Sequence, residues 1–265
     1  MKLAFVSAAL ATAIAGSAAS AQVLSHTAFD VGMYTLNRAN GTITPGSLVL
    51  DRATALAYAD WSAPQGSGVL NGGLVTGLNR LDGDRVSLVP NGVNLLSDLG
   101  FSFYNLNAAG STSRITSFTA EFNFFDGNTL AFVDGFNAGT FSLASLSGGG
   151  LAAQSSIRFN FGAAALEPLD IQLPNNVVIT MTVTAVTFSA GTGTDPNLIG
   201  QQVRNPVSVG TSTDELVLNG SIVADPFGTG PDGNFSYFVV TNSIPTPASA
   251  ALLGLGGLVA VRRRR

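Results

Sequence analysis

Apolar and polar residues alternate along much of this chain, and the alternation limits its fold more than any other feature. Every second residue is apolar in the ranges 118–124 and 177–183. A period of two places these side chains on one face of a β-strand and their polar neighbours on the other. Weaker runs predict further strands at 28–36, 85–89, 99–106, 140–146, 157–161, 169–173, 202–209, 216–223 and 235–241.

Turn residues separate these runs. Asn-Gly and Asp-Gly pairs, which accept positive φ, occur at 40–41, 91–92, 126–127, 134–135, 219–220 and 232–233. Two longer stretches, 62–73 and 190–200, are expected to be loops, and the only candidate helix in this part of the chain is a short one at 51–60. The predicted fold is all-β, an antiparallel, jelly-roll-like β-sandwich in a single domain over residues 22–243.

Composition excludes several classes of function. The chain has no Cys and a single His, His26, which excludes disulfides, thiol nucleophiles, Cys-type zinc sites and multi-His metal centres. Residues 22–243 contain seven arginines, no lysine and all sixteen acidic residues. Such an acidic body repels phosphate backbones, so nucleic-acid binding is not expected.

The N-terminus has the features of a secretory signal over residues 1–21. Lys2 supplies positive charge, an apolar run follows, and Ala19-Ser20-Ala21 gives the small-x-small pattern of a cleavage site. The expected structure of this segment is a signal helix that is removed on export. The alternative is an ordinary N-terminal helix.

The C-terminal residues 244–265 have the features of a short membrane anchor. Pro245 and Pro247 flank Thr246, 14 uncharged and mostly apolar residues follow, and the chain ends in Arg262, Arg263, Arg264 and Arg265. A short hydrophobic helix is expected here, although the apolar run is shorter than the ~20 residues that span a bilayer comfortably. The arginines would stop transfer on the cytoplasmic side. A permanent single-pass anchor is the alternative to a transient one.

This tail resembles a PEP-CTERM sorting signal, with Thr246 where Glu is usual, as in a planctomycete-like variant. The resemblance implies export and a cell-surface or extracellular location in a biofilm-forming bacterium. It also implies transient recognition by an exosortase, a membrane transpeptidase that acts near the Pro-x-Pro motif. The resemblance covers about 22 residues. The rest of the chain resembles only generic β-sandwich ectodomains.

Two loops carry carboxylates that a calcium ion would accept as ligands. Asp82 and Asp84 flank a glycine at a predicted strand start, and Asp225 and Asp232 lie in one ten-residue loop. Calcium prefers six or more oxygen ligands, and either loop supplies part of that set. The alternative is that each Asp-Gly pair only forms a turn. No other cofactor is expected.

A possible carbohydrate site lies at Tyr58 and Trp61, because exposed aromatic faces stack on sugars. The alternative is a hydrophobic plug that closes the end of the sandwich. No catalytic residue is assigned; a secreted hydrolase would require distant acids to meet within ~5–10 Å in a cleft. We therefore expect a non-enzymatic surface or matrix protein, with a lectin-like module as the alternative and extracellular polysaccharide as a possible partner.

Overall fold

The computed structural model describes residues 23–24, 29–46, 54–60, 72–89, 93–204, 207–224 and 234–244. These residues form two β-sheets, one short helix, α1 (Ala163–Leu166), and a 3-10 turn, η2 (Glu167–Leu169). The described part of the chain is thus mainly β-structure, as the alternation predicted. The signal helix and the C-terminal helix fall outside the described residues.

The large sheet has 11 strands. They are β1 (Val23–Leu24), β2 (Phe29–Asn37), β3 (Thr42–Pro45), β4 (Thr54–Ala59), β5 (Gly72–Val75), β7 (Val93–Asn105), β10 (Ser155–Asn160), β11 (Gln172–Leu173), β13 (Ile199–Arg204), β16 (Asn234–Phe235) and β17 (Tyr237–Ile244). The main path runs β1-β5-β13-β7-β10-β2-β3, and β17 lies between β7 and β4. The most C-terminal of the described strands, β17, is therefore an inner strand of this sheet.

The small sheet has 6 strands in the order β15-β14-β6-β12-β8-β9. They are β6 (Asp82–Ser87), β8 (Ile115–Asp126), β9 (Phe132–Ser142), β12 (Asn176–Phe188), β14 (Thr211–Leu218) and β15 (Ser221–Ala224). Every pair in this sheet is antiparallel. The large sheet is antiparallel except where β10 pairs with β2, which is parallel.

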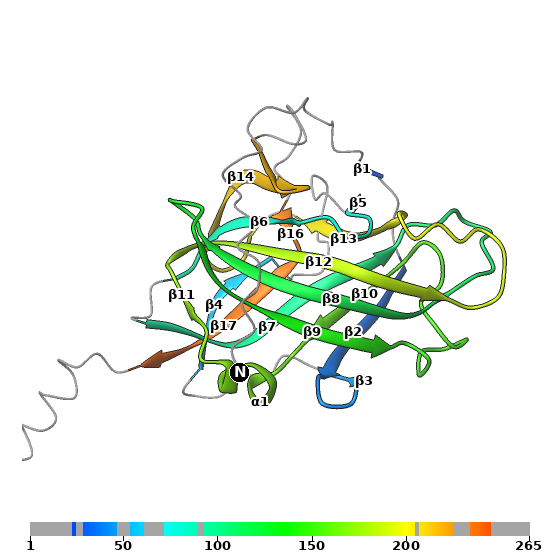
Figure 1. Cartoon of the computed structure of the whole chain (residues 1–265), viewed down its shortest axis with the longest axis horizontal. Helices are drawn as coiled ribbons and strands as arrows, with labels where there is room; N and C mark the ends of the chain where they lie inside the picture. The colour runs from blue at the N-terminus through cyan, green and yellow to red at the C-terminus, as the bar shows by residue number, and fades with distance from the viewer. Residues whose placement is uncertain are drawn as a thin grey trace, which may run out of the picture.

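The two sheets pack against each other and bury one core. Figure 1 shows β8, β9 and β12 lying across β7, β10 and β2. Phenylalanines join the layers: the Phe103 ring of β7 stacks on Phe118 of β8 at 4.8 Å between centroids, and Phe101 meets Phe122 at 5.0 Å. The fold is therefore sandwich-like, with the period-two apolar residues of β8 and β12 on its inner side.

Several sequence predictions need correction. The run at 216–223 is a hairpin, β14 and β15, which turns at Asn219 and Gly220 with φ of 50° and 78°. Asp134 and Gly135 form no turn, since they lie within β9 and pair with Phe124 and Asn123 of β8. The strand predicted at 169–173 is reduced to β11 by the 3-10 turn before it.

The candidate helix at 51–60 does not form where it can be compared. Residues 54–59 are strand β4, which pairs with β17 about 180 positions later in the sequence. The distant strand β17 supplies the backbone hydrogen bonds of this segment. At the other end of the domain, β17 continues to Ile244, one residue past the predicted domain boundary at 243.

Candidate functional site

Tyr58 lies inside the molecule. It sits on β4 opposite Val239 of β17, and its side chain is 0% exposed. A sugar needs an uncovered aromatic face, and Tyr58 offers none. The prediction of an exposed aromatic platform is therefore wrong for Tyr58, because the residue lies on strand β4 with its side chain in the core and not on a surface helix. Trp61 lies outside the described residues.

Asp82 and Asp84 also point inward. They are two residues apart on β6 and so share a face with the core residue Val86. Both are 0% exposed. The Asp82 carboxylate accepts hydrogen bonds from the Arg80 guanidinium at 3.2 Å and from the backbone N–H of Asn219 at 2.8 Å. Asp82 thereby anchors the turn between β14 and β15.

Asp84 binds a different part of the fold. Its Oδ1 accepts a hydrogen bond from Ser212 Oγ at 3.2 Å. A bulge in β14 allows this contact: Ser212 pairs with Val86 and Leu216 pairs with Asp84, so three residues of β14 lie opposite Arg85 alone. This contact ties β6 to the bulge of β14.

Burial decides the protonation of these carboxyls. Burial raises the pKa of Asp84 well above its usual value, and the nearby charge of Asp60 raises it further, against the hydrogen bond from Ser212. Burial raises the pKa of Asp82 to about 6, against the Asn219 N–H and Arg80. Ionisation of either carboxyl therefore costs free energy.

Around Asp84 lies a buried polar cluster, which we define as Asp84, Asp60, Tyr58, Tyr237 and Gln201. All five side chains are 0% exposed. Asp84 Oδ2, both tyrosine hydroxyls and both amide atoms of Gln201 have no hydrogen-bond partner. Burial also raises the pKa of both tyrosines, and Asp84 is the next cause. The cluster draws on β4, β6, β13 and β17.

The sequence analysis missed most of this cluster. Gln201, Asp60 and Tyr237 lie in runs whose pattern gave no reason to bring them together. The only signal in the sequence was a polar residue, such as Asp84, at a position of a strand that faces the core. Recognising that position requires the strand register, which the sequence does not supply.

Calcium ligation gains no support in the described part of the chain. No group of three or more His, Asp or Glu residues there lies close enough together to hold a metal ion. Asp82 is bound to Arg80, and both Asp82 and Asp84 face the core. Asp225 and Asp232 lie outside the described residues, as do Pro245, Thr246, Pro247 and the four terminal arginines. Among the described helices, none is long and apolar enough to cross a membrane.

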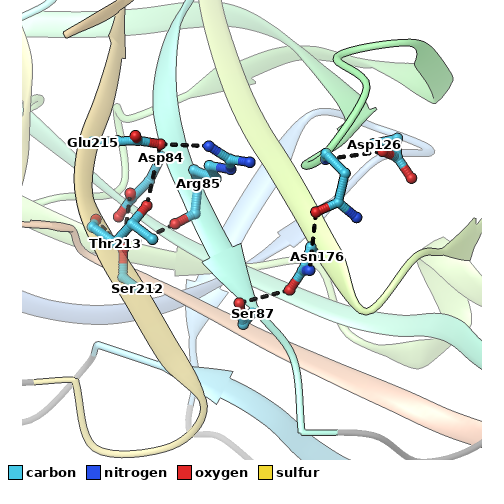
Figure 2. A network of polar contacts seen from close by, with 9 residues as sticks. Asp84, Arg85, Ser87, Asp126, Asn176, Ser212, Thr213 and Glu215 are labelled. Carbon is cyan, nitrogen blue, oxygen red and sulfur yellow. Dashed lines mark hydrogen bonds and ion pairs between the residues drawn. The ribbon is translucent and has the colours of Figure 1, made fainter. Parts of the chain in front are cut away.

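The opposite side of the small sheet carries a surface network, seen in Figure 2. Arg85 forms an ion pair with Glu215 at 2.6 Å, with both side chains partly exposed. Ser87 donates to Asn176 at 2.7 Å, and Asn176 reaches Asn128 at 3.3 Å. These contacts connect β14, β6, β12 and the turn after β8 on the outer face. Pairs of this kind at a surface contribute little to stability.

Comparison with known proteins identifies no relative. No family model, no curated protein and no solved structure matches the chain. The site must therefore be judged from its own geometry.

Further along the outer face, neutral hydrogen-bonding side chains dominate β8, β9 and β12. Thr119 bonds Thr140 at 2.7 Å, and Ser117 bonds Thr187 at 2.6 Å. The strand register places Thr182, Glu121 and Asn137 in the adjacent row. We call this surface the hydroxyl face and define it by Ser117, Thr119, Asn123, Asn137, Thr140, Ser142, Thr182 and Thr187. Each of these side chains is at least partly exposed. Glu121 is the only charged group within these rows.

Proposed function

We propose that this chain is an exported, non-enzymatic structural or adhesive protein of the cell surface or extracellular matrix, whose hydroxyl face contacts neutral polysaccharide. The observation that carries the proposal is the hydroxyl face itself. A hydroxyl is both a donor and an acceptor, and side-chain amides supply both roles as well. Such a surface matches the hydroxyls of a sugar polymer without requiring charge.

Weak contacts suit a long polymer. One sugar unit gains little from a few solvent-exposed hydrogen bonds, since each replaces a bond to water. Many units along one chain act together, because each further contact is intramolecular after the first. The rows from β12 through β8 to β9 repeat such contacts along the strands.

The two ends of the chain extend the proposal. Residues 1–21 are proposed to be a signal peptide, and 244–265 a PEP-CTERM-like tail that an exosortase-type transpeptidase recognises after membrane insertion. The motifs described above support this. A jelly-roll-like connectivity of the sandwich belongs to the same proposal, supported by its two mainly antiparallel sheets.

A polysaccharide retention assay tests the function. The full chain is applied to the host's own exopolysaccharide in calcium and in EDTA. Thr119→Val and Thr140→Val, made together, remove two hydroxyls with little change of shape and are expected to reduce retention. Thr44→Val is the matched control, because Thr44 is an exposed threonine on β3 of the large sheet.

The outcomes separate the hypotheses. Equal retention of the double variant and the wild type would refute a role for the hydroxyl face. Retention that EDTA abolishes would instead favour the lectin-like alternative with calcium. Circular dichroism of each variant checks that folding is unchanged.

A further inference from the structure

Two aromatic rings lie at one end of the hydroxyl face. Phe125 of β8 pairs with Phe132 of β9, one row beyond Asn123. Phe125 points away from the main core, because its neighbour Phe124 belongs to that core while Phe125 packs in a separate small cluster with Val178. We call Phe125 and Phe132 the aromatic pair. The pair therefore shares the outer side of the small sheet with the hydroxyl rows.

Phe132 leaves much of its ring uncovered. It is 54% exposed, whereas Phe125 beside it is 6% exposed. The two rings meet edge to face, with centroids 5.7 Å apart and an angle of 76° between their planes. This contact favours one orientation of the Phe132 ring. An oriented ring that is open to solvent can stack on another apolar surface with little further loss of conformational entropy.

The turn before Phe132 is built at a cost. Leu130 has φ of 58°, a left-handed conformation that is unfavourable for a bulky residue. Two backbone hydrogen bonds of 2.8 Å close the turn, from the Leu130 N–H to the Asp126 carbonyl and from the Asp126 N–H to the Ala131 carbonyl. Leu130 packs against the small cluster that contains Phe125. The turn thereby places an apolar side chain beside Phe125, while Phe132 stays exposed.

Polar side chains follow the aromatic pair along the strands. The next row pairs Asn123 with Gly135, and the Asn123 side chain approaches this glycine so closely that a Cβ there would lie 2.7 Å from its Oδ1. Glu121 lies in the row after that. Four positions along β8 separate Glu121 from Phe125, a distance of roughly 13 Å. An aromatic ring, an amide and a carboxylate thus succeed one another on one surface.

This order of groups matches one class of sugar polymer. In a β-linked glucan the ring substituents are equatorial, so the C–H bonds form apolar ring faces and the hydroxyls lie around the edge. An apolar face stacks on an aromatic ring, and the edge hydroxyls bond to an amide and donate to a carboxylate. A polyuronate carries carboxylates of its own, which Glu121 and the acidic body, residues 22–243, would repel.

We propose that the aromatic pair, Asn123 and Glu121 form a subsite for a neutral β-linked glucan, with one sugar ring stacked on Phe132. The inference rests on the proposed function, because it names the polymer that the hydroxyl face contacts. The aromatic pair and the carboxylate are too far apart for a single sugar ring to reach both. An oligosaccharide is therefore expected to bind, and a monosaccharide is not.

Retention of the full chain on insoluble cellulose, a neutral β-linked glucan, is the test. Phe132→Ala removes the stacking ring and is expected to weaken retention about fivefold or more. Phe132→Trp supplies a larger aromatic face and should be retained at least as well as the wild type. Phe29→Ala is the matched control, because Phe29 is exposed on β2 of the large sheet. Soluble cello-oligosaccharides should compete with cellulose for the wild type, and glucose should not.

Glu121→Gln tests the discrimination by charge. Glutamine keeps an acceptor and nearly the same shape, so retention on cellulose should persist, whereas retention on polyuronate beads should rise above that of the wild type. Asp170→Asn is the matched control, because it removes the same charge at an exposed residue after η2, outside the hydroxyl face. An equal rise in both variants would assign the effect to net charge and not to Glu121.

The outcomes separate the subsite from the proposed function. If Phe132→Ala and Phe29→Ala are retained equally, while Thr119→Val with Thr140→Val weakens retention, the hydroxyl face stands and the subsite falls. If the host's exopolysaccharide retains the wild type and cellulose does not, only the glucan assignment falls. If neither polymer retains the wild type, both proposals fall.

Two further measurements complete the test. A wild-type dimer in sedimentation, dissociated by Phe132→Ala, would overturn the subsite by showing that a second copy covers the ring. Circular dichroism checks the folding of each variant. If Phe132→Ala does not fold, Phe132→Trp and the oligosaccharide competition still decide the question, since loss of retention in the first or competition by glucose alone would contradict stacking on this ring.

Discussion

The Asp82 carboxylate accepts a 2.8 Å hydrogen bond from the backbone N–H of Asn219, 137 positions later in the chain. The next residue of that turn, Gly220, donates its N–H to the Leu81 carbonyl at 2.8 Å. Two bonds thus fasten the β14–β15 turn to the start of β6. The turn itself needs positive φ at both residues, which Asn and Gly tolerate.

Asp82→Ala should therefore destabilise the domain. The substitution leaves the Asn219 N–H and the Arg80 guanidinium without their acceptor, which costs about 1–3 kcal/mol of the free energy of unfolding. Urea denaturation at about pH 4, where the contribution of Asp82 is complete, measures the change. Asn219→Gly is a useful comparison, since it keeps the backbone N–H and the turn geometry and should cost much less. A loss below a few tenths of a kcal/mol in Asp82→Ala would contradict the anchoring role.

The pH dependence of stability gives a separate prediction for the same residue. Because burial raises the pKa of Asp82 to about 6, its contribution is complete below about pH 4 and is lost as the pH rises to about 6. The loss is of the order of 3 kcal/mol. Asp82→Asn cannot titrate, so its unfolding free energy should vary less in this window.

Asp126→Asn supplies the control for that titration. Hydrogen bonds from Thr129 and Asn128 lower the pKa of this exposed carboxyl. Its titration is therefore complete below the window, and the slope between about pH 4 and about 6 should match the wild type. If Asp82→Asn keeps the full slope, Asp82 is not its source.

Much of the fold was predictable from local pattern, and the reasons are visible in β8 and β12. Their alternation is strict, and the structure confirms both strands with the apolar residues inside. Tyr58 shows the limit of such patterns. Its neighbours Asp60 and Trp61 suggested a polar surface segment, but burial was decided by β17, which lies far along the chain.

Asp134 and Gly135 show the same limit for turns. An Asp-Gly pair favours positive φ locally, yet pairing with Asn123 and Phe124 keeps both residues in an extended strand. The candidate sites were harder still. Asp82 and Asp84 were recognised as candidate site residues, but their inward direction depends on the strand register. A shift of the register by one residue would turn both side chains outward.

The phenylalanine rings packed between the two sheets are expected to contribute strongly to the free energy of unfolding. Phe118 contacts four other rings, with centroids between 4.8 and 6.4 Å away. Phe118→Ala should lower the free energy of unfolding by about 3–5 kcal/mol. Phe29→Ala is the control, because Phe29 is 72% exposed and should change stability little. Similar losses in the two variants would argue against this core.

Gly100 tests the packing on the other side of the large sheet. A methyl group at this position would overlap the Phe238 ring on the neighbouring strand β17. Gly100→Ala should therefore destabilise by about 1–3 kcal/mol through overpacking. Combining it with Phe238→Leu, which makes room, should cost less than the sum of the two single changes. Simple additivity would show that the two residues do not compete for space.

The inner position of β17 has a consequence for how the molecule forms. The middle of the large sheet stays incomplete until residues 237–244 have been synthesised, because β4 and β7 are both flanked by this late strand. Contacts between residues so distant in sequence slow folding, because the entropy of closing the long loop is lost before the contacts form and stabilise the chain. The large sheet is therefore completed only by its most C-terminal described strand, and β4 can pair with the rest of the sheet only late in synthesis.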